Sequence, residues 1–302
     1  IEKNFHSLKT HLNIVYDKSP LNDINADAYD NIDIVCVDQS ILSSDILKKL
    51  KHLKLIALRC TGYDHVDLKA CKELDITVCN VPGYAANSVA EHTFALILSI
   101  SRKLEKAQKF TRKTIFSWEG LQGFELDGKT LAIIGTGAIG KRTAEIASGF
   151  NMKIIAYDLN PDPKWAQQFN VAYDEFDRVL TCADIITLCI PSMPEATHLM
   201  SVSQFNQMKE GVILINTARG ELINNIALID ALGSGKVSYA GLDVLPFEHH
   251  IRDKCKMIFN RFKSNTEITQ ILANYMLCQH PNVLITPHIG WFPKRLIKKH
   301  ST

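Results

Sequence analysis

The sequence predicts an α/β protein with two Rossmann- or flavodoxin-like domains, each a doubly wound parallel sheet, and an active-site cleft between the domains. Three observations predict this fold. Short runs rich in Val and Ile alternate with helical patterns along the chain, as in parallel α/β proteins. A length of 302 residues is enough for two domains of ordinary size. The balance of 46% hydrophobic and 22% charged residues is typical of a soluble globular protein.

The first domain is predicted over residues 1–93. Strands are expected at "LNIVYD", "IDIVCVD", "LKLIALRC" and "ITVCNV", and a helix at "SSDILKKLKHL" with Ser43 or Ser44 as its cap. The chain begins in a helix-like "EKNFHSLK", so we expect that an N-terminal strand of this domain is missing. Residues 289–302 are expected to complete the domain.

The segment "NSVAEHTFALILSISRKLEKAQ" predicts one long helix, opened by Asn87 or Ser88, with Glu91 placed for a capping box. Its largely apolar surface predicts burial between domains or between subunits, which is consistent with a homodimer. A second domain is predicted over 94–288. Its strands are expected at "KTLAIIG", "MKIIAYD", "ADIITLCIP", "GVILINTA", "SYAGLDVL" and "NVLITPH", the rhythm of a nucleotide-binding sheet.

Composition narrows the classes of function. Lys and Arg number 34 and Asp and Glu 32, so the net charge of +2 gives no reason to expect nucleic acid or an acidic membrane as a partner. No apolar run is long enough to span a membrane and none resembles a signal peptide. The 8 cysteines form no CxxC pair, which favours a reducing compartment over a disulfide frame or metal site. The sequence therefore predicts a cytoplasmic protein.

A G-x-G-x-x-G pattern, Gly135, Gly137 and Gly140, follows the strand "LAII" and opens a helix. The next strand ends in Asp158, close to the spacing of about 20 residues at which a dinucleotide-binding unit places its ribose-binding carboxylate. Glycines permit the tight turn and the approach of backbone to pyrophosphate, and the helix N-terminus supplies amide donors. A glycine-rich turn of another α/β protein is the alternative, but strand, turn, helix and acid together favour a dinucleotide.

The acid also indicates which dinucleotide is bound. A carboxylate at Asp158 would bond the ribose hydroxyls and repel a 2′-phosphate. The residues that follow are Leu159 and Asn160 rather than an arginine. The sequence therefore predicts NAD rather than NADP as the cofactor.

Polar residues follow three later strands, at the strand ends where open α/β sheets bind ligands. "ILINTARGELI" supplies Arg219, "GLDVLPFE" supplies Asp243 and Glu248, and "LITPHIG" supplies His288. Taken singly, each has an ordinary alternative: an arginine at a strand end is usually a surface ion pair, and a glutamate after a loop is usually solvated. For the other histidines, His65 and His92 among them, a structural role is the preferred interpretation.

At this point the chain resembles the D-isomer-specific 2-hydroxyacid dehydrogenases. The motifs "VPGYAANSVAEHTFALIL", "GTGAIG", "NTARGELI", "GLDV" followed by an acid, and "TPHIG" occur in family order from about residue 11 to 290. The resemblance implies that Arg219, Glu248 and His288 are catalytic. It also implies substrate contacts from Thr61, Gly62 and Tyr84, and cofactor contacts from Gly135, Gly137, Ala138, Ile139, Gly140, Asp158, Ile190, Pro191, Thr217, Ala218 and Asp243.

The chemistry of the three catalytic residue types agrees with these roles. A planar guanidinium at Arg219 can grip a substrate carboxylate at two points and polarise the neighbouring 2-oxo group. Reduction of that carbonyl needs a proton on oxygen as hydride reaches carbon, and His288 is the natural donor near neutral pH. A carboxylate at Glu248 would favour the protonated imidazole.

The substrate is predicted from the segment between Glu248 and "HPNVLITPH", which is longer than in many family members and similar to the D-lactate dehydrogenase branch. We therefore expect reduction of pyruvate to D-lactate with NADH. Reduction of glyoxylate or hydroxypyruvate is the nearest alternative, because the Arg–Glu–His set does not select the group at carbon 3. A non-catalytic NAD-sensing module of the same fold is the alternative from another class.

Three further expectations concern the C-terminal part. In "EITQILANYML", Ile268, Ile271, Leu272, Tyr275 and Met276 share one helical face, which predicts packing on the body of the protein. The pair His249–His250 near Cys255 fits no standard zinc spacing, so no metal is expected. After "GWF" the sequence from Pro293 onward departs from the family, so we expect a shortened returning helix or a truncated chain.

Overall fold

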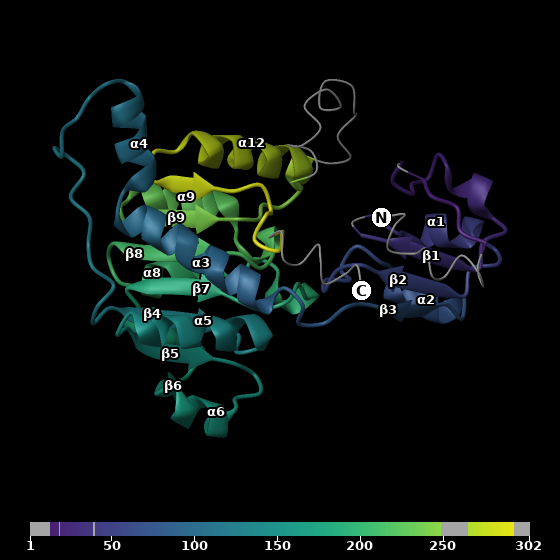
Figure 1. Ribbon diagram of the computed structural model, residues 1–302, viewed down its shortest axis with the longest axis horizontal. Helices are drawn as coiled ribbons and strands as arrows, with labels where there is room; N and C mark the ends of the chain where they lie inside the picture. The colour runs from purple at the N-terminus through teal and green to yellow at the C-terminus, as the bar shows by residue number, and fades with distance from the viewer. Residues whose placement is uncertain (1–12, 18, 39, 249–264, 293–302) are drawn as a thin grey trace. The chain divides into compact units, whose positions relative to one another are not determined.

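The structure, a computed structural model, describes residues 13–17, 19–38, 40–248 and 265–292. Within this part of the chain there are two compact units, one ending at Ala85 and the other spanning Ala86–Phe292 (Figure 1). The predicted domain boundary at 93/94 lies inside the first long helix of the second unit. Residues 293–302, most of the segment expected to complete the first domain, lie outside the described residues, as do the "EKNFHSLK" helix and the His249–His250 pair.

The first unit contains a three-stranded parallel sheet in the order β1-β2-β3. Val35, Ile56 and Leu58 alternate with more exposed strand residues, and their buried side chains join one apolar cluster with the helices. The elements of this unit are η2 (Ala26–Tyr29), β1 (Ile34–Val37), α1 (Ser44–Lys49), β2 (Leu55–Leu58), α2 (Leu68–Glu73) and β3 (Thr77–Cys79). Ser43 is the N-cap residue of α1, one of the two predicted caps, although its side chain makes no capping hydrogen bond.

One predicted strand of the first unit is wrong. The described part of "LNIVYD", residues 13–17, is irregular, and Val15 is 73% exposed. The β-branched residues of this segment favour a strand. Strand propensity, however, depends on packing against neighbouring strands and the core, and Val15 remains largely exposed.

The second unit is built on a seven-stranded parallel sheet in the order β10-β9-β8-β7-β4-β5-β6. The first strand, β4, lies between β5 and β7, so the strand order reverses there, as in doubly wound dinucleotide-binding folds. The strands are β4 (Thr130–Ile134), β5 (Lys153–Tyr157), β6 (Val171–Tyr173), β7 (Ile185–Leu188), β8 (Val212–Asn216), β9 (Val237–Leu242) and β10 (Val283–Ile285). The six predicted strands are all present, and β6 is an additional strand that was not predicted from the sequence.

Helices cover both faces of this sheet (Figure 1). Successive residues of β4 point to opposite faces: Ala132 and Ile134 join one buried apolar cluster, and Leu131 and Ile133 join another. The helical elements are α3 (Ala86–Ser101), α4 (Leu104–Arg112), α5 (Ala138–Gly149), α6 (Pro163–Gln168), α7 (Phe176–Cys182), η3 (Pro194–Ala196), α8 (Val202–Gln207), η4 (Gly220–Leu222), α9 (Asn225–Gly233) and α12 (Asn265–Gln279). Among the described helices, none combines the length and apolarity needed to cross a membrane.

The long helix predicted from residue 87 is two helices. α3 ends at Ser101, and Lys103, with φ +49, turns the chain before α4 begins at Leu104. Phe94, Leu96 and Ile97 of α3 are buried in a cluster with strands of the second unit rather than left for another surface. The helix begins at Ala86, and Glu91 accepts a hydrogen bond from the side chain of Asn87 instead of closing a capping box.

α12 packs on the rest of the second unit, as predicted, but only part of the predicted face does so. Ile271 is buried, but Leu272, Tyr275 and Met276 are 58%, 37% and 58% exposed. The face that packs on the second unit, mainly against α9, instead carries Gln270, Ile271, Ala273, Asn274 and Leu277. On this face Asn274 hydrogen-bonds both Asn225 and the carbonyl of Pro246, whereas the larger side chains of Leu272 and Met276 are exposed.

Candidate active site

The phosphate turn lies where the strand order reverses. Gly135, with φ +97, follows β4, and a Cβ there would come 2.5 Å from Cγ2 of Ile190, which follows β7. At Gly140 a Cβ would lie 2.0 Å from the carbonyl oxygen of Gly135, so only glycine lets helix and turn approach this closely. Gly137 caps α5 and would have nothing within 4 Å of its Cβ. Its open side leaves room for a phosphate at the start of the helix.

Asp158 comes directly after β5, beside the same turn. Its Oδ2 accepts hydrogen bonds from the backbone N of Thr136 at 2.5 Å and from Thr136 Oγ1 at 2.9 Å, and its Oδ1 accepts one from Asn160 N at 2.8 Å. Burial raises the pKa of Asp158, but these hydrogen bonds and the charge of Lys141 outweigh it and hold the pKa below its ordinary value. The carboxylate is therefore ionised at neutral pH. The glycine cradle and this acid fit NAD.

Arg219 stands in the turn between β8 and η4. Asn216, the fully buried last residue of β8, accepts a hydrogen bond from Ala218 N at 3.0 Å and donates one to the carbonyl oxygen of Arg219 at 2.8 Å. The guanidinium Nη1 donates to the carbonyl of Ala218 at 2.7 Å. At the next residue, Gly220, a Cβ would lie 2.1 Å from the carbonyl carbon of Leu245. This contact places the turn of Arg219 against the segment that leads to Glu248.

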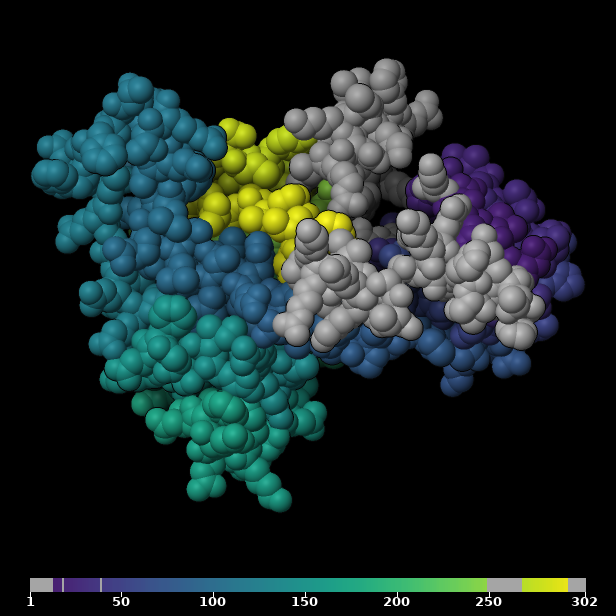
Figure 2. All heavy atoms as spheres, in the orientation of Figure 1, coloured from purple at the N-terminus to yellow at the C-terminus, as the bar shows by residue number. Residues whose placement is uncertain are grey.

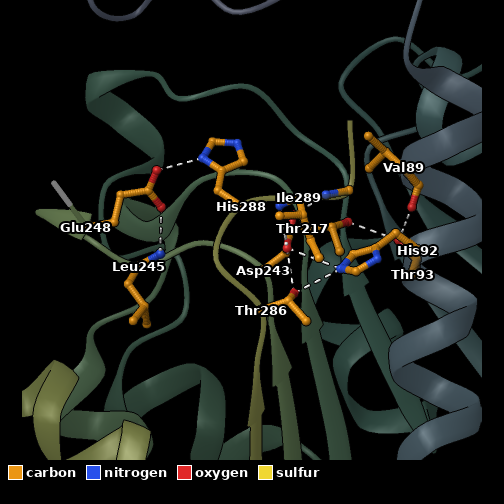
Figure 3. A network of polar contacts seen from close by, with 11 residues as sticks. Val89, His92, Thr93, Thr217, Asp243, Leu245, Glu248, Thr286, His288 and Ile289 are labelled. Carbon is orange, nitrogen blue, oxygen red and sulfur yellow. Dashed lines mark hydrogen bonds and ion pairs between the residues drawn. The ribbon is translucent and has the colours of Figure 1, made fainter. Parts of the chain in front are cut away.

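His288 and Glu248 form a close pair beyond the ends of β10 and β9 (Figure 3). The imidazole Nδ1 lies 2.6 Å from Glu248 Oε1, and Leu245 N donates to Glu248 Oε2 at 3.4 Å. The side chains are 23% and 34% exposed, so both remain accessible to a small ligand. His288 has φ +55, a left-handed conformation that costs a non-glycine residue about 1–2 kcal/mol.

Asp243, the residue after β9, holds the turn that carries His288. Its Oδ1 accepts hydrogen bonds from Thr286 Oγ1 at 2.5 Å and Ile289 N at 3.0 Å, and its Oδ2 accepts one from Gly290 N at 2.9 Å. Its backbone carbonyl accepts from His288 N at 2.8 Å. These bonds offset the strained conformation of His288 because they attach the turn on both sides of it.

His92 of α3 completes this cluster. Its Nε2 lies 2.9 Å from Thr286 Oγ1 and 3.1 Å from Asp243 Oδ1, and its neighbour Thr93 hydrogen-bonds Thr217 Oγ1 at 3.0 Å (Figure 3). Burial raises the pKa of Asp243, but the hydrogen bonds from His92, Thr286 and the amides of Gly290 and Ile289 outweigh it, so the pKa is held below its ordinary value. Asp243 is therefore a buried carboxylate that stays ionised.

The structure thus brings most of the predicted site residues of the second unit to one end of its sheet. Ala138 and Ile139 begin α5, Ile190 and Pro191 follow β7, and Thr217 and Ala218 follow β8. From the sequence, only a structural role was predicted for His92 and none for Thr286. Their position within "AEHT" and "TPHIG", two motifs already quoted for the family, was the available signal.

The three predicted substrate contacts Thr61, Gly62 and Tyr84 belong to the first unit. The carbonyl of Thr61 accepts a hydrogen bond from Asn80 Nδ2 at 2.7 Å, and Thr61 Oγ1 donates to the carbonyl of Val81 at 3.0 Å. Burial, with the nearby Cys60 and Asp38, raises the pKa of Tyr84 to about 12, so its phenol keeps its proton at neutral pH. Their part in substrate binding stays a prediction.

The second unit has the features of a dinucleotide-binding domain: a doubly wound sheet, a glycine cradle and an ionised acid on the ribose side. Comparison with known proteins identifies the family. The profile of the family described as "D-isomer specific 2-hydroxyacid dehydrogenase, NAD binding domain" matches residues 94–290. D-lactate dehydrogenase of Escherichia coli is 40% identical over 248 residues, which is 82% of this chain and 73% of that protein. Hydroxypyruvate reductase of Blautia hydrogenotrophica is 33% identical over 296 residues, 95% of this chain and 84% of that one.

A solved structure agrees. D-lactate dehydrogenase from Aquifex aeolicus, complexed with NAD and lactic acid, superposes with a TM-score of 0.89 at 31% identity, covering 98% of this chain and 88% of that one. The chain belongs to the D-isomer-specific 2-hydroxyacid dehydrogenase family. It is an NAD-dependent oxidoreductase that acts on 2-hydroxy acids or their 2-oxo counterparts, as the sequence predicted.

Proposed function

We propose that this protein is a D-lactate dehydrogenase, which reduces pyruvate to D-lactate with NADH, and that Arg219, Glu248 and His288 carry the reaction. The observation that carries the proposal is the 2.6 Å contact between His288 and Glu248, which lies beside the turn of Arg219 in one unit. Similarity to D-lactate dehydrogenases in sequence and in structure supports the substrate.

Bound NADH supplies the hydride. The residues of this chain supply the rest: the guanidinium of Arg219 binds the substrate carboxylate and polarises the 2-oxo oxygen. Because Glu248 occupies Nδ1 of His288, the proton passes through Nε2 to the oxygen that becomes the hydroxyl. In the reverse direction neutral His288 takes that proton back. Glu248 stabilises the protonated imidazole and fixes the orientation of the ring.

The test is NADH oxidation by the purified chain with pyruvate, glyoxylate, hydroxypyruvate and phenylpyruvate in parallel. We expect the highest kcat/KM with pyruvate. A preference for hydroxypyruvate or glyoxylate would contradict the proposed substrate and leave the family assignment intact. Turnover of none of the four, with measurable NADH binding, would contradict the enzyme and favour an NAD-sensing module.

We propose further that the protein is a homodimer joined through α4 and the segment that follows it. None of the residues of α4 is buried, and Phe116 and Trp118 are 97% and 87% exposed. This segment stands out from the rest of the second unit in Figure 2. Exposed aromatics on a projecting segment are typical of a surface that a partner covers. Sedimentation of the wild type as a dimer, and of the double variant Phe116→Ser/Trp118→Ser as a monomer, is expected; equal masses would contradict this interface.

A cytoplasmic location is part of the proposal. It is supported by thiols such as Cys71 and Cys189, which are not in disulfides, as suits a reducing compartment. Fractionation of the source cells should place the protein with the cytosolic markers, and recovery with membranes or in the medium would contradict this.

A further inference from the structure

α12, a helix that lies in the sequence between the proposed acid Glu248 and the proposed proton donor His288, meets the body of the second unit through two buried amides. Asn274 of α12 is fully buried, and Asn225, the first residue of α9, is 1% exposed. Asn225 Nδ2 donates to Asn274 Oδ1 at 2.7 Å, and Asn274 Nδ2 donates to the carbonyl oxygen of Pro246 at 2.6 Å. The two side chains therefore form a relay from α9 through α12 to the loop of Glu248.

The carbonyl at the end of this relay lies two residues before Glu248. The intervening Phe247 has φ +54, so the chain reverses direction there through a left-handed residue that is not glycine. The orientation of the Pro246 peptide therefore determines where the next residues lead. A hydrogen bond on its carbonyl fixes that orientation.

The loop of Pro246 also makes a close backbone contact with the turn of Arg219. A Cβ on Gly220 would lie 2.2 Å from the backbone N of Pro246 and 2.6 Å from the carbonyl oxygen of Leu245. The loop is thus held between a close backbone contact and a side-chain hydrogen bond. Within the described residues, the Glu248 carboxylate itself is held by the 3.4 Å hydrogen bond from Leu245 N and by its contact with His288.

We infer that Asn274 is a positioning residue for the acid–base pair: it holds the carbonyl of Pro246 and so keeps Glu248 against His288. The inference rests on the proposed function, since it gives α12 a part in that reaction. A leucine at this position would fill similar space, but only an amide supplies a donor to Pro246 and an acceptor to Asn225 at once. This gives a reason for a fully buried asparagine on the inward face of α12, among the apolar Ile271, Ala273 and Leu277.

The test is a double-mutant cycle between Asn274 and Glu248, with kcat and KM for the best 2-oxo acid as readouts. Asn274→Leu should lower kcat about tenfold to a hundredfold, since small displacements of a reacting group have effects of this size, and leave KM for NADH unchanged. In the Glu248→Gln background the same substitution should change kcat less than about twofold, because coupled residues are not additive. Leu272→Ala, on the exposed face of the same helix, is the matched control and should keep wild-type kcat.

Asn274→Ala guards against a folding defect peculiar to the leucine variant, because alanine is neutral and has the best helix propensity. It removes the donor to Pro246 and the acceptor for Asn225 without placing a charge in the interior. We expect a soluble variant with the same fall in kcat. An unchanged kcat, or equal losses in both Glu248 backgrounds, would overturn the inference and show that Asn274 only stabilises the fold. Absence of turnover by the wild-type chain would instead contradict the proposed function, and the inference with it.

Discussion

Two carboxylates in the segment that follows β9, Asp243 and Glu248, differ in burial and in the number of hydrogen bonds that they accept. Asp243 is 2% exposed and accepts hydrogen bonds from Thr286 and two backbone amides, with His92 beside it. Glu248, a few residues later, is 34% exposed and has two contacts, one of them to His288. The first carboxylate is held rigidly as part of the scaffold, whereas the second is left accessible at the histidine. A rigid anchor beside a lightly held acid suits a site where one group must stay charged and another must support proton transfer.

The largest effect on activity is expected at His288, the partner of the more accessible carboxylate Glu248. His288→Gln should lower kcat by about 10²–10⁴, the range for loss of a general acid–base group, because the amide cannot donate a proton. NADH binding should be unchanged, since the substitution leaves the glycine turn and Asp158 intact. Steady-state kinetics and a fluorescence titration with NADH measure both, and wild-type kcat would refute the role of His288.

Arg219→Lys should come next, with a fall in kcat/KM of about 10²–10³, comparable to removing one donor from a preorganised site. A single ammonium cannot reproduce the planar fork that grips carboxylate and 2-oxo oxygen together. Kinetics with pyruvate over a range of concentrations separate the KM and kcat components. Wild-type values in this variant would show that the arginine does not touch the substrate.

The buried carboxylate should affect stability more than the exposed one. Asp243→Asn should lower the free energy of unfolding by about 2 kcal/mol, because a charged acceptor of several hydrogen bonds is lost in the interior. Glu248→Gln is the matched control and should change it by less than about 0.5 kcal/mol, as for an exposed ion pair. Denaturant unfolding of both variants measures the difference, and equal losses would contradict the distinction drawn between the two carboxylates.

The smallest effect is expected in the pH dependence of stability at acid pH. The pKa of Asp243 is lower in the folded protein than its ordinary value of 3.8, so its contribution to stability is present above that value and is lost as pH falls through the folded pKa. Asp243→Asn lacks this contribution, so its stability should depend less on pH over that acid window. Thermal unfolding of both proteins between neutral and acid pH tests the sign; a gap that widens on acidification would contradict it.

The sequence predicted the sheet of the second unit well because its strands are short apolar runs with a motif residue directly after them. The glycine turn, Asp158, Arg219, Asp243 and His288 could all be placed at strand ends in this way. β6 is only three residues long and has an exposed Ala172, so it carries no periodic signal that distinguishes it from a loop.

Other features depend on contacts that no local pattern contains. The bonds of His92 to Thr286 and Asp243 join segments far apart in sequence, so composition alone favoured a structural histidine. In α12, Asn274 faces inward because it hydrogen-bonds Asn225 and the carbonyl of Pro246. The apolar pattern of the helix predicted a different inward face. α4 is a different case. The helical sequence pattern continues past Lys103, but none of the residues of α4 is buried, so no packing partner determines the direction of this helix.

The most direct test of the central claim is reduction of NAD by the purified chain with D-lactate and L-lactate in parallel, repeated with His288→Gln. We predict that the wild type consumes D-lactate and leaves L-lactate unchanged, and that the variant loses most of the D-lactate activity while it still binds NADH. Comparable rates with both isomers, or undiminished activity of His288→Gln, would contradict the account.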